Sequence, residues 1–182
     1  DCPERRSFGK RAPVAEAADT TPSSSAGAVP TARRPRTLAD ILRALDAHGA
    51  SVALVALSDG APVEMSYAAL ARDAGRLSGG LAARGVQVGD TVAIFAPSRI
   101  AWVIAALAIV RAGAVLLPLD MNLEGDDLRE LLRDADCHRI FSTTALAERL
   151  VRDGAAPTLD LYLLDGDEQN RPANAIDARA LM

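Results

Sequence analysis

The 182-residue sequence is poor in aromatic side chains, cysteine and histidine. Aromatic residues make up only 3%, so a buried core has to come from Leu, Val, Ile and Ala, which the hydrophobic content of 49% can supply. Cys2 and Cys137 form no CxxC pair, and His48 and His138 stand apart from them and from each other. We therefore expect no metal site. Two unpaired thiols favour a reducing, cytoplasmic location over a disulfide-bonded secreted scaffold.

Lysine is scarcer still. Lys and Arg together number 20, and Lys10 is the only lysine, so none follows position 10. The net charge is −4 and the pI is about 5.2. This acidic balance argues against nucleic acid or an anionic membrane surface as the main partner. The sequence begins with Asp1 rather than Met, which predicts a piece of a longer protein or a processed product.

The sequence also lacks an uninterrupted apolar run long enough to cross a membrane. Its most apolar stretch, 91–119, is broken by Pro97, Arg99 and Arg111. A membrane-spanning helix needs about 20 predominantly apolar residues. A buried strand–helix–strand unit explains the same apolarity without placing charge in lipid, so we expect no membrane span.

Three segments are expected along the chain. Residues 1–36 predict a disordered linker or arm, because serines and prolines interrupt any periodicity and large apolar residues are almost absent. Seven basic residues against four acidic ones make a weak basic tether the alternative interpretation of this arm. Residues 37–164 predict one folded domain. Residues 165–182 are polar, are broken by Pro172, and predict an unfinished connection.

Strands and helices alternate through the folded segment. Capping residues, apolar periodicity and turn signals predict helices that begin after Thr37, after Ser66 and over 100–110, 124–135 and 145–152, and strands over 51–57, 63–66, 91–96, 114–119, 139–142 and 159–164. This order predicts an α/β fold with a mostly parallel sheet and helices on both faces. The last strand, 159–164, would leave an open sheet edge.

Three motifs in this order resemble a known family. MSYAAL at Met65–Leu70 opens a helix, GVQVGDTVA at Gly85–Ala93 leads into a buried strand, and RAGAVLLPLD at Arg111–Asp120 closes the next strand. Together they resemble the N-terminal part of the acyl-adenylate-forming (AMP-binding) superfamily, which includes acyl-CoA synthetases, peptide-synthetase adenylation domains and luciferases. The resemblance covers about 37–164, and its most specific element is similar to the family's (K/R)-A-G-x-x-x-x-P-x-D segment. Ala69 departs from the family's frequent Glu.

The resemblance implies a two-step reaction. A carboxylate attacks the α-phosphate of ATP to give an acyl-adenylate, and a thiol, often coenzyme A, then takes the acyl group. ATP, Mg and coenzyme A would be the cofactors of the full-length parent. The family supplies the chemistry from a Ser/Thr/Gly-rich loop ending in Lys, from later acidic and aromatic nucleotide contacts and from a C-terminal lysine, and none of these can be placed here.

The sequence therefore predicts an N-terminal fragment of an ATP-dependent ligase that is inactive on its own. No catalytic, cofactor-binding or metal-binding residue is assigned to it. The parent would take a carboxylic acid, ATP and a thiol acceptor, and the rest of the ligase chain would be the structural partner. An acyl-CoA synthetase of the fatty-acid type is favoured.

Three alternatives stay open. The chain could be a fragment of a peptide-synthetase adenylation domain. It could also be a stand-alone, non-catalytic interaction module that buries its sheet edges by dimerising. A nucleotide-binding α/β domain of an unrelated family is disfavoured, because no GxGxxG or P-loop glycine pattern is present.

Several single residues invite a functional interpretation. Asp120 follows a buried strand at the end where α/β sheets bind ligands, although a turn-and-cap role is favoured. The Tyr67 hydroxyl could contact a partner, but a core aromatic with an exposed tip is the simpler interpretation. Trp102, on an all-apolar helix, is expected in the core.

Two sets of residues also allow both a ligand-binding and a structural interpretation. Three glycines could cradle a phosphate, but their spacing favours helix ends and turns: Gly85, Gly89 and Gly113. Six acidic residues could bind a cation, but their alternation with Arg129 and Arg133 favours a solvated helix face: Glu124, Asp126, Asp127, Glu130, Asp134 and Asp136.

Overall fold

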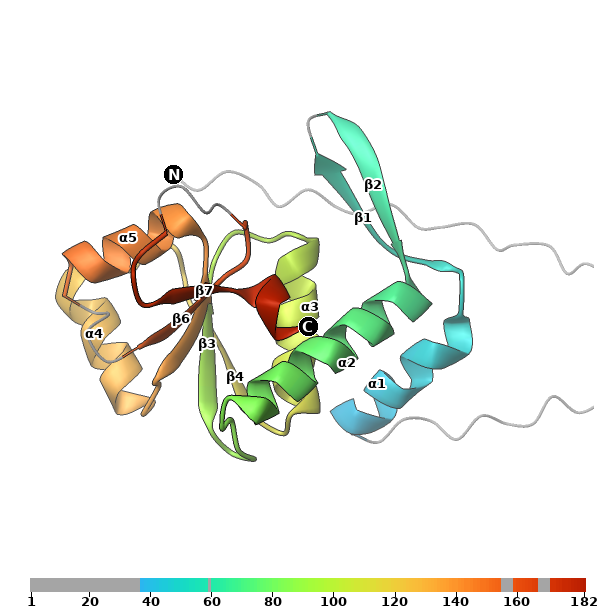
Figure 1. Cartoon of the computed structure of the whole chain (residues 1–182), viewed down its shortest axis with the longest axis horizontal. Helices are drawn as coiled ribbons and strands as arrows, with labels where there is room; N and C mark the ends of the chain where they lie inside the picture. Colours follow the sequence, from blue (N-terminus) through green and yellow to red (C-terminus); the bar gives the residue numbers. More distant parts are fainter. Residues whose placement is uncertain (1–36, 59, 155–158, 167–170) are drawn as a thin grey trace, which may run out of the picture. The chain divides into compact units, whose positions relative to one another are not determined.

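The computed structural model describes residues 37–58, 60–154, 159–166 and 171–182 (Figure 1). These residues belong to one compact unit, Pro35–Met182. The expected linker at 1–36 lies outside the described residues. Within them, no helix is long and apolar enough to cross a membrane.

The first helix begins where its capping residue predicts. In α1 (Leu38–Leu45) the Thr37 hydroxyl accepts a bond from the Asp40 amide at 3.1 Å, and the Asp40 carboxylate accepts one from the Thr37 amide at 3.1 Å. This reciprocal pair satisfies the Thr37 amide and gives a side-chain acceptor to the Asp40 amide, which also donates to the Thr37 carbonyl at 3.1 Å. A short 3₁₀ turn, η1 (Asp46–His48), follows, and Leu42 is buried.

The predicted hairpin and the long helix after it are confirmed. Strands β1 (Val52–Ser58) and β2 (Ala61–Ser66) pair antiparallel as a separate two-stranded sheet. Helix α2 (Tyr67–Ala83) starts at Ser66, whose hydroxyl accepts a bond from the Ala69 amide at 3.2 Å. The hairpin therefore leads directly into a capped helix.

The main sheet is parallel throughout, as predicted. Its strands are β3 (Thr91–Phe95), β4 (Val115–Pro118), β5 (Arg139–Ser142), β6 (Asp160–Leu163) and β7 (Ala175–Asp177). They lie in the order β4-β3-β5-β6-β7. Pro118 fits the edge strand β4, because proline cannot donate to a further ladder.

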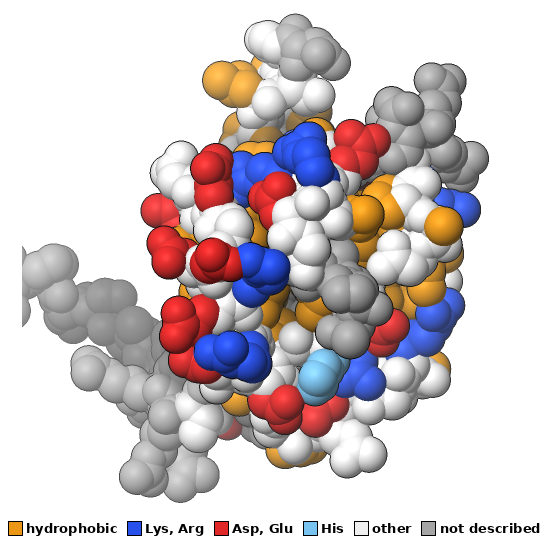
Figure 2. Space-filling model, turned by 90° about the vertical axis from the view of Figure 1, so that its left-hand side faces the viewer, with side chains coloured by type: hydrophobic (Ala, Val, Ile, Leu, Met, Phe, Trp, Pro, Cys, Tyr) orange, Lys and Arg blue, Asp and Glu red, His pale blue; other side chains and the backbone are white. Residues whose placement is uncertain are grey.

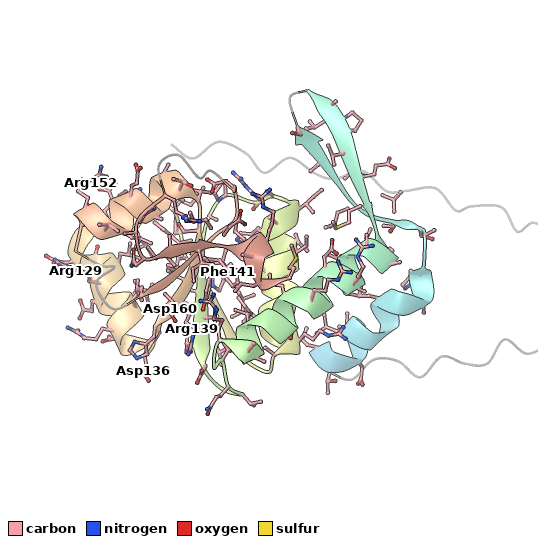
Figure 3. The ribbon with its side chains drawn as sticks, viewed as in Figure 1. Arg129, Asp136, Arg139, Phe141, Arg152 and Asp160 are labelled. Carbon is pink, nitrogen blue, oxygen red and sulfur yellow. The ribbon has the colours of Figure 1, made fainter. Side chains whose placement is uncertain are left out.

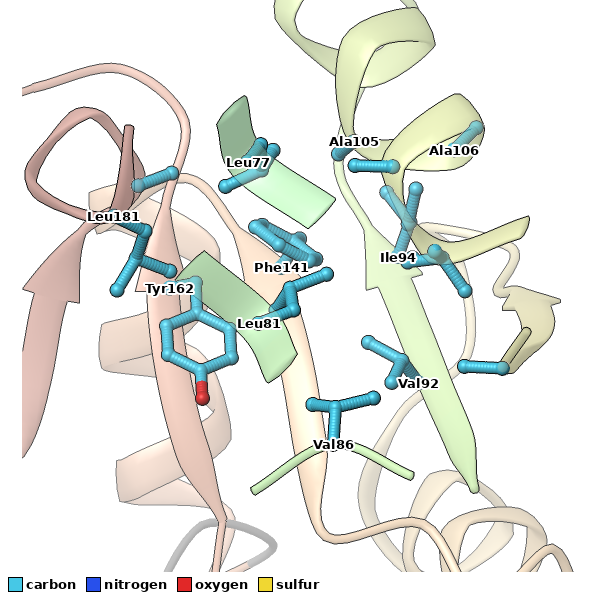
Figure 4. Close-up of a cluster of buried hydrophobic side chains, with 14 of the residues drawn as sticks. Leu77, Leu81, Val86, Val92, Ile94, Ala105, Ala106, Phe141, Tyr162 and Leu181 are labelled. Atoms are coloured by element: carbon cyan, nitrogen blue, oxygen red, sulfur yellow. The ribbon is translucent and has the colours of Figure 1, made fainter. Parts of the chain in front are cut away.

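Helices cover both faces of this sheet, which explains the lack of alternation in β3. One face packs against α2 and α3 (Ile100–Arg111), and the other against α4 (Gly125–Asp134) and α5 (Thr144–Arg152). Val92 and Ile94 point to the first side, and Ala93 and Phe95 to the second. Figure 4 shows the first core, in which Phe141 and Tyr162 lie between the sheet and α2 with ring centroids 5.1 Å apart.

The prediction that 159–164 is the last strand was wrong. The segment beyond it, expected to be only a polar connection, carries β7 and the 3₁₀ turn η2 (Ala178–Leu181). Strand β6 therefore lies between β5 and β7, and β7 forms the open edge instead. A three-residue strand between polar segments is too short to show a strand period, so its burial at Ala175 left no readable signal.

Asp177 joins β7 to η2, and its carboxylate predicts a pH-dependent contribution to stability. It accepts bonds from the Arg179 amide at 2.8 Å and from the Arg179 guanidinium at 2.6 Å. The bond from the Arg179 side chain holds the pKa of Asp177 below its ordinary value. A depressed carboxyl pKa stabilises the fold above the unfolded value, about 3.9, and this contribution is lost as pH falls through the folded pKa.

We therefore expect Asp177→Asn to be less stable than the wild type at pH 7, with a difference that shrinks as the pH is lowered below about 3.9. Urea unfolding of both proteins across this range measures the effect. A difference that does not change with pH would show that the carboxylate charge plays no part.

Candidate functional site

The strand order indicates where a ligand would sit. Strand β4 lies on one side of β3, and the chain then crosses to place β5 on the other side. In open α/β sheets this reversal makes a crevice at the carboxyl ends of the strands, where ligands usually bind. The candidate site is therefore the edge at which β3, β5 and β6 end.

Hydroxyl groups at this edge are engaged within the protein. The Ser142 hydroxyl donates to the Phe95 carbonyl at 2.9 Å in a buried position, which ties β5 to β3. The Thr144 amide and hydroxyl both donate to the Asp165 carboxylate, at 2.8 and 3.0 Å. Asp165 thus caps α5 from the end of β6, a role that sequence reasoning missed because the two residues are 21 positions apart.

A half-buried arginine organises the loop between β4 and α4. Arg149 of α5 donates from Nη2 to the carbonyls of Met121 and Leu123, at 2.7 and 2.8 Å. Its guanidinium carbon lies 4.9 Å from the centre of the Phe95 ring, and its side chain is only 20% exposed. The Arg149 guanidinium is therefore bonded to the backbone of this loop. Its role was not evident from the sequence, because an arginine next to Glu148 on a helix looks like an ordinary surface residue.

Asp120 has the structural role that its position favoured. Its Oδ1 accepts bonds from the Asn122 amide and from Asn122 Nδ2, both at 2.9 Å. Its carbonyl accepts from the Leu123 amide at 3.1 Å. These bonds form a local Asx turn after β4.

The two aromatic candidates also act in packing. Tyr67 stacks on His48 with ring centroids 4.7 Å apart and is half-buried. Trp102 is only partly buried and packs against the core between α3 and the sheet, so it is less enclosed than expected.

The three glycines are helix ends and turns, not a phosphate cradle. Gly85, Gly89 and Gly113 have φ values of +82°, +91° and +78°. Gly113 ends α3 where a Cβ would lie 2.9 Å from a Val88 methyl group, so space and backbone both require glycine.

The acidic residues of α4 are interleaved with arginine partners. Asp126 pairs with Arg129, and Glu130 and Asp134 lie 3.7 and 3.4 Å from Arg133. Figure 2 shows acidic and basic side chains interspersed on the side where α4 and α5 lie. Among the described residues no group of three or more His, Cys, Asp or Glu is placed to hold a metal ion. A solvated helix face accounts for the pattern.

Two surface hollows lie at the opposite, amino-terminal edge of the sheet, and a third, of about 500 Å³, lies along α4. One of about 260 Å³ is lined by residues that include Cys137 and His138, and another of about 180 Å³ by residues that include Asp90 and Arg139. The usual ligand edge of the fold and these hollows therefore do not coincide. We favour the carboxyl edge on topological grounds, because ligands of open α/β sheets usually bind where the strand order reverses.

Arg139 shows how the amino edge is held together (Figure 3). Its Nη1 pairs with Asp90 at 3.0 Å, its Nη2 donates to the Gly85 carbonyl at 3.4 Å, and its Nε lies 3.6 Å from Asp160. The side chain is largely buried and links the loop before β3 to β5 and β6. Burial raises the pKa of the nearby Tyr162 hydroxyl, which stays protonated at neutral pH.

Comparison with known proteins identifies the family. Residues 42–180 match the AMP-binding enzyme family along most of the chain. The chain belongs to the AMP-binding enzyme family. The match covers the hairpin and the five-stranded sheet, and it confirms the resemblance seen in the motifs at Gly85–Ala93 and Arg111–Asp120.

Curated relatives share this part of the AMP-binding enzyme sequence. A feruloyl-CoA synthase of Amycolatopsis is 32% identical over 123 residues, which are 65% of this chain and 25% of that protein. Surfactin synthase subunit 2 of Bacillus subtilis is 35% identical over 117 residues, which are 63% of this chain and 3% of that protein. The chain thus spans a quarter or less of the length of these relatives.

Solved structures of AMP-binding enzymes have the same fold. An acyl-CoA synthetase of Brucella canis superposes with a TM-score of 0.64 at 25% identity, over 73% of this chain and 24% of that one. Coronafacic acid ligase of Pectobacterium brasiliense, as its R395G mutant form, superposes with a TM-score of 0.69 at 14% identity, over 79% and 28%. The second likeness concerns the fold alone.

The described residues do not fit the nucleotide that the family name implies. A triphosphate and its metal need free donors and cations. At the carboxyl edge the Ser142 and Thr144 hydroxyls are bonded within the protein, and Arg149 is bound to two carbonyls. Arg99, exposed at the start of α3, adds one cation, and no lysine follows Lys10. No reaction step can be derived from these residues.

Proposed function

We propose that this chain is the N-terminal portion of an ATP-dependent, acyl-adenylate-forming ligase. The complete ligase would join a carboxylic acid to AMP with release of pyrophosphate and then pass the acyl group to a thiol. The observation that carries the proposal is the family match over 42–180, which spans only a quarter or less of the length of the curated relatives.

The chain alone is proposed to be inactive. Support comes from the lack of any lysine after Lys10 and from the engagement of Arg149, Ser142 and Thr144 in contacts within the protein. Phosphoryl-transfer chemistry depends on cations and donors that face the developing charge. The residues that bind ATP and Mg would therefore lie in other parts of the ligase.

Coenzyme A is the proposed thiol acceptor, and a fatty or aromatic acid the proposed substrate class. The names of the Amycolatopsis relative, a feruloyl-CoA synthase, and of the Brucella canis acyl-CoA synthetase support this choice. A carrier protein is the competing acceptor, because surfactin synthase subunit 2 matches at a similar identity. The cytoplasmic location drawn from the unpaired cysteines stays a prediction.

The proposal is tested by carboxylate-dependent ATP–pyrophosphate exchange with the purified 182-residue chain. We expect no exchange above a protein-free blank for ferulate, a long-chain fatty acid or an amino-acid mixture. Titration calorimetry should show weak ATP binding or none. Robust exchange by the chain alone would overturn the inactive-portion proposal, and it would also exclude the stand-alone, non-catalytic module.

A further inference from the structure

We draw no further inference here: the strongest candidate, the hollow of about 260 Å³ beyond the C-terminal ends of α4 and α5 at the amino-terminal edge of the sheet, carries nothing, because its two arginines, Arg129 and Arg133, pair with acidic residues of α4 and residues 155–158 next to its lining lie outside the described part of the chain.

Discussion

Replacement of Gly80 by alanine is expected to lower the free energy of unfolding by about 2 kcal/mol, whereas the same replacement at Gly79 raises it by about 0.5–1 kcal/mol. The two glycines are neighbours in α2, so the pair separates helix propensity from packing. Both changes remove the cost of a glycine in a helix interior, which is about 1 kcal/mol. Only the change at Gly80 adds a clash.

The clash comes from the C-terminal turn η2. A Cβ at Gly80 would lie 2.8 Å from the backbone carbon and the Cβ of Leu181 and closer still to its carbonyl oxygen. Backbone atoms cannot move aside as a flexible side-chain tip can, so η2 has to shift away from α2. At Gly79 a Cβ would meet nothing within 4 Å. Overfilling a packed contact typically costs about 1–3 kcal/mol.

Urea and thermal unfolding of the two variants measure the difference. In a domain of this size each kcal/mol corresponds to about 2–4 °C in melting temperature. We expect Gly80→Ala to melt below the wild type and Gly79→Ala above it. Equal or higher stability of Gly80→Ala would mean that η2 does not pack on α2 in solution.

Replacement of Arg149 by methionine is expected to cost about 2 kcal/mol. The variant keeps an apolar stem against Phe95 but loses the charged bonds to the Met121 and Leu123 carbonyls. Bonds that involve a charged group contribute about 1.5–3 kcal/mol, and an arginine over an aromatic ring adds about 0.5–1. The loop between β4 and α4 should lose its fixed position as well.

Arg152→Met supplies the control on the same helix (Figure 3). Arg152 is 72% exposed and lies 3.7 Å from Asp153, and exposed pairs of this kind contribute about 0–1 kcal/mol. Denaturant unfolding gives the stability of both variants, and hydrogen exchange at 121–123 reports on the loop. Equal effects of the two substitutions would refute a special role for Arg149.

Local signals predicted most of the fold. The apolar run of β3 indicated a strand buried on both faces, and the structure places Val92 and Ala93 in the two separate cores. Ser66 predicted the start of α2, and its hydroxyl makes the capping bond. Such features depend on residues within a few positions of one another, so a single sequence can reveal them.

Long-range contacts could not be predicted. Arg149 reaches a carbonyl 28 positions away, and Arg139 reaches one 54 positions away. The close approach of Leu181 to Gly80 likewise depends on β7, which had no periodic signal. These contacts arise only when the sheet has assembled. At the carboxyl edge, therefore, the sequence indicated Asp120 but not Arg149 or Asp165.

We propose that this chain, a member of the AMP-binding enzyme family, contributes packing to a ligase whose chemistry lies in other residues. The most direct test is ATP–pyrophosphate exchange, measured side by side in the 182-residue chain and in the polypeptide extended beyond Met182. The account predicts no exchange by the first and carboxylate-dependent exchange by the second. Exchange by the 182-residue chain alone, at a rate that the extension does not increase, would contradict it.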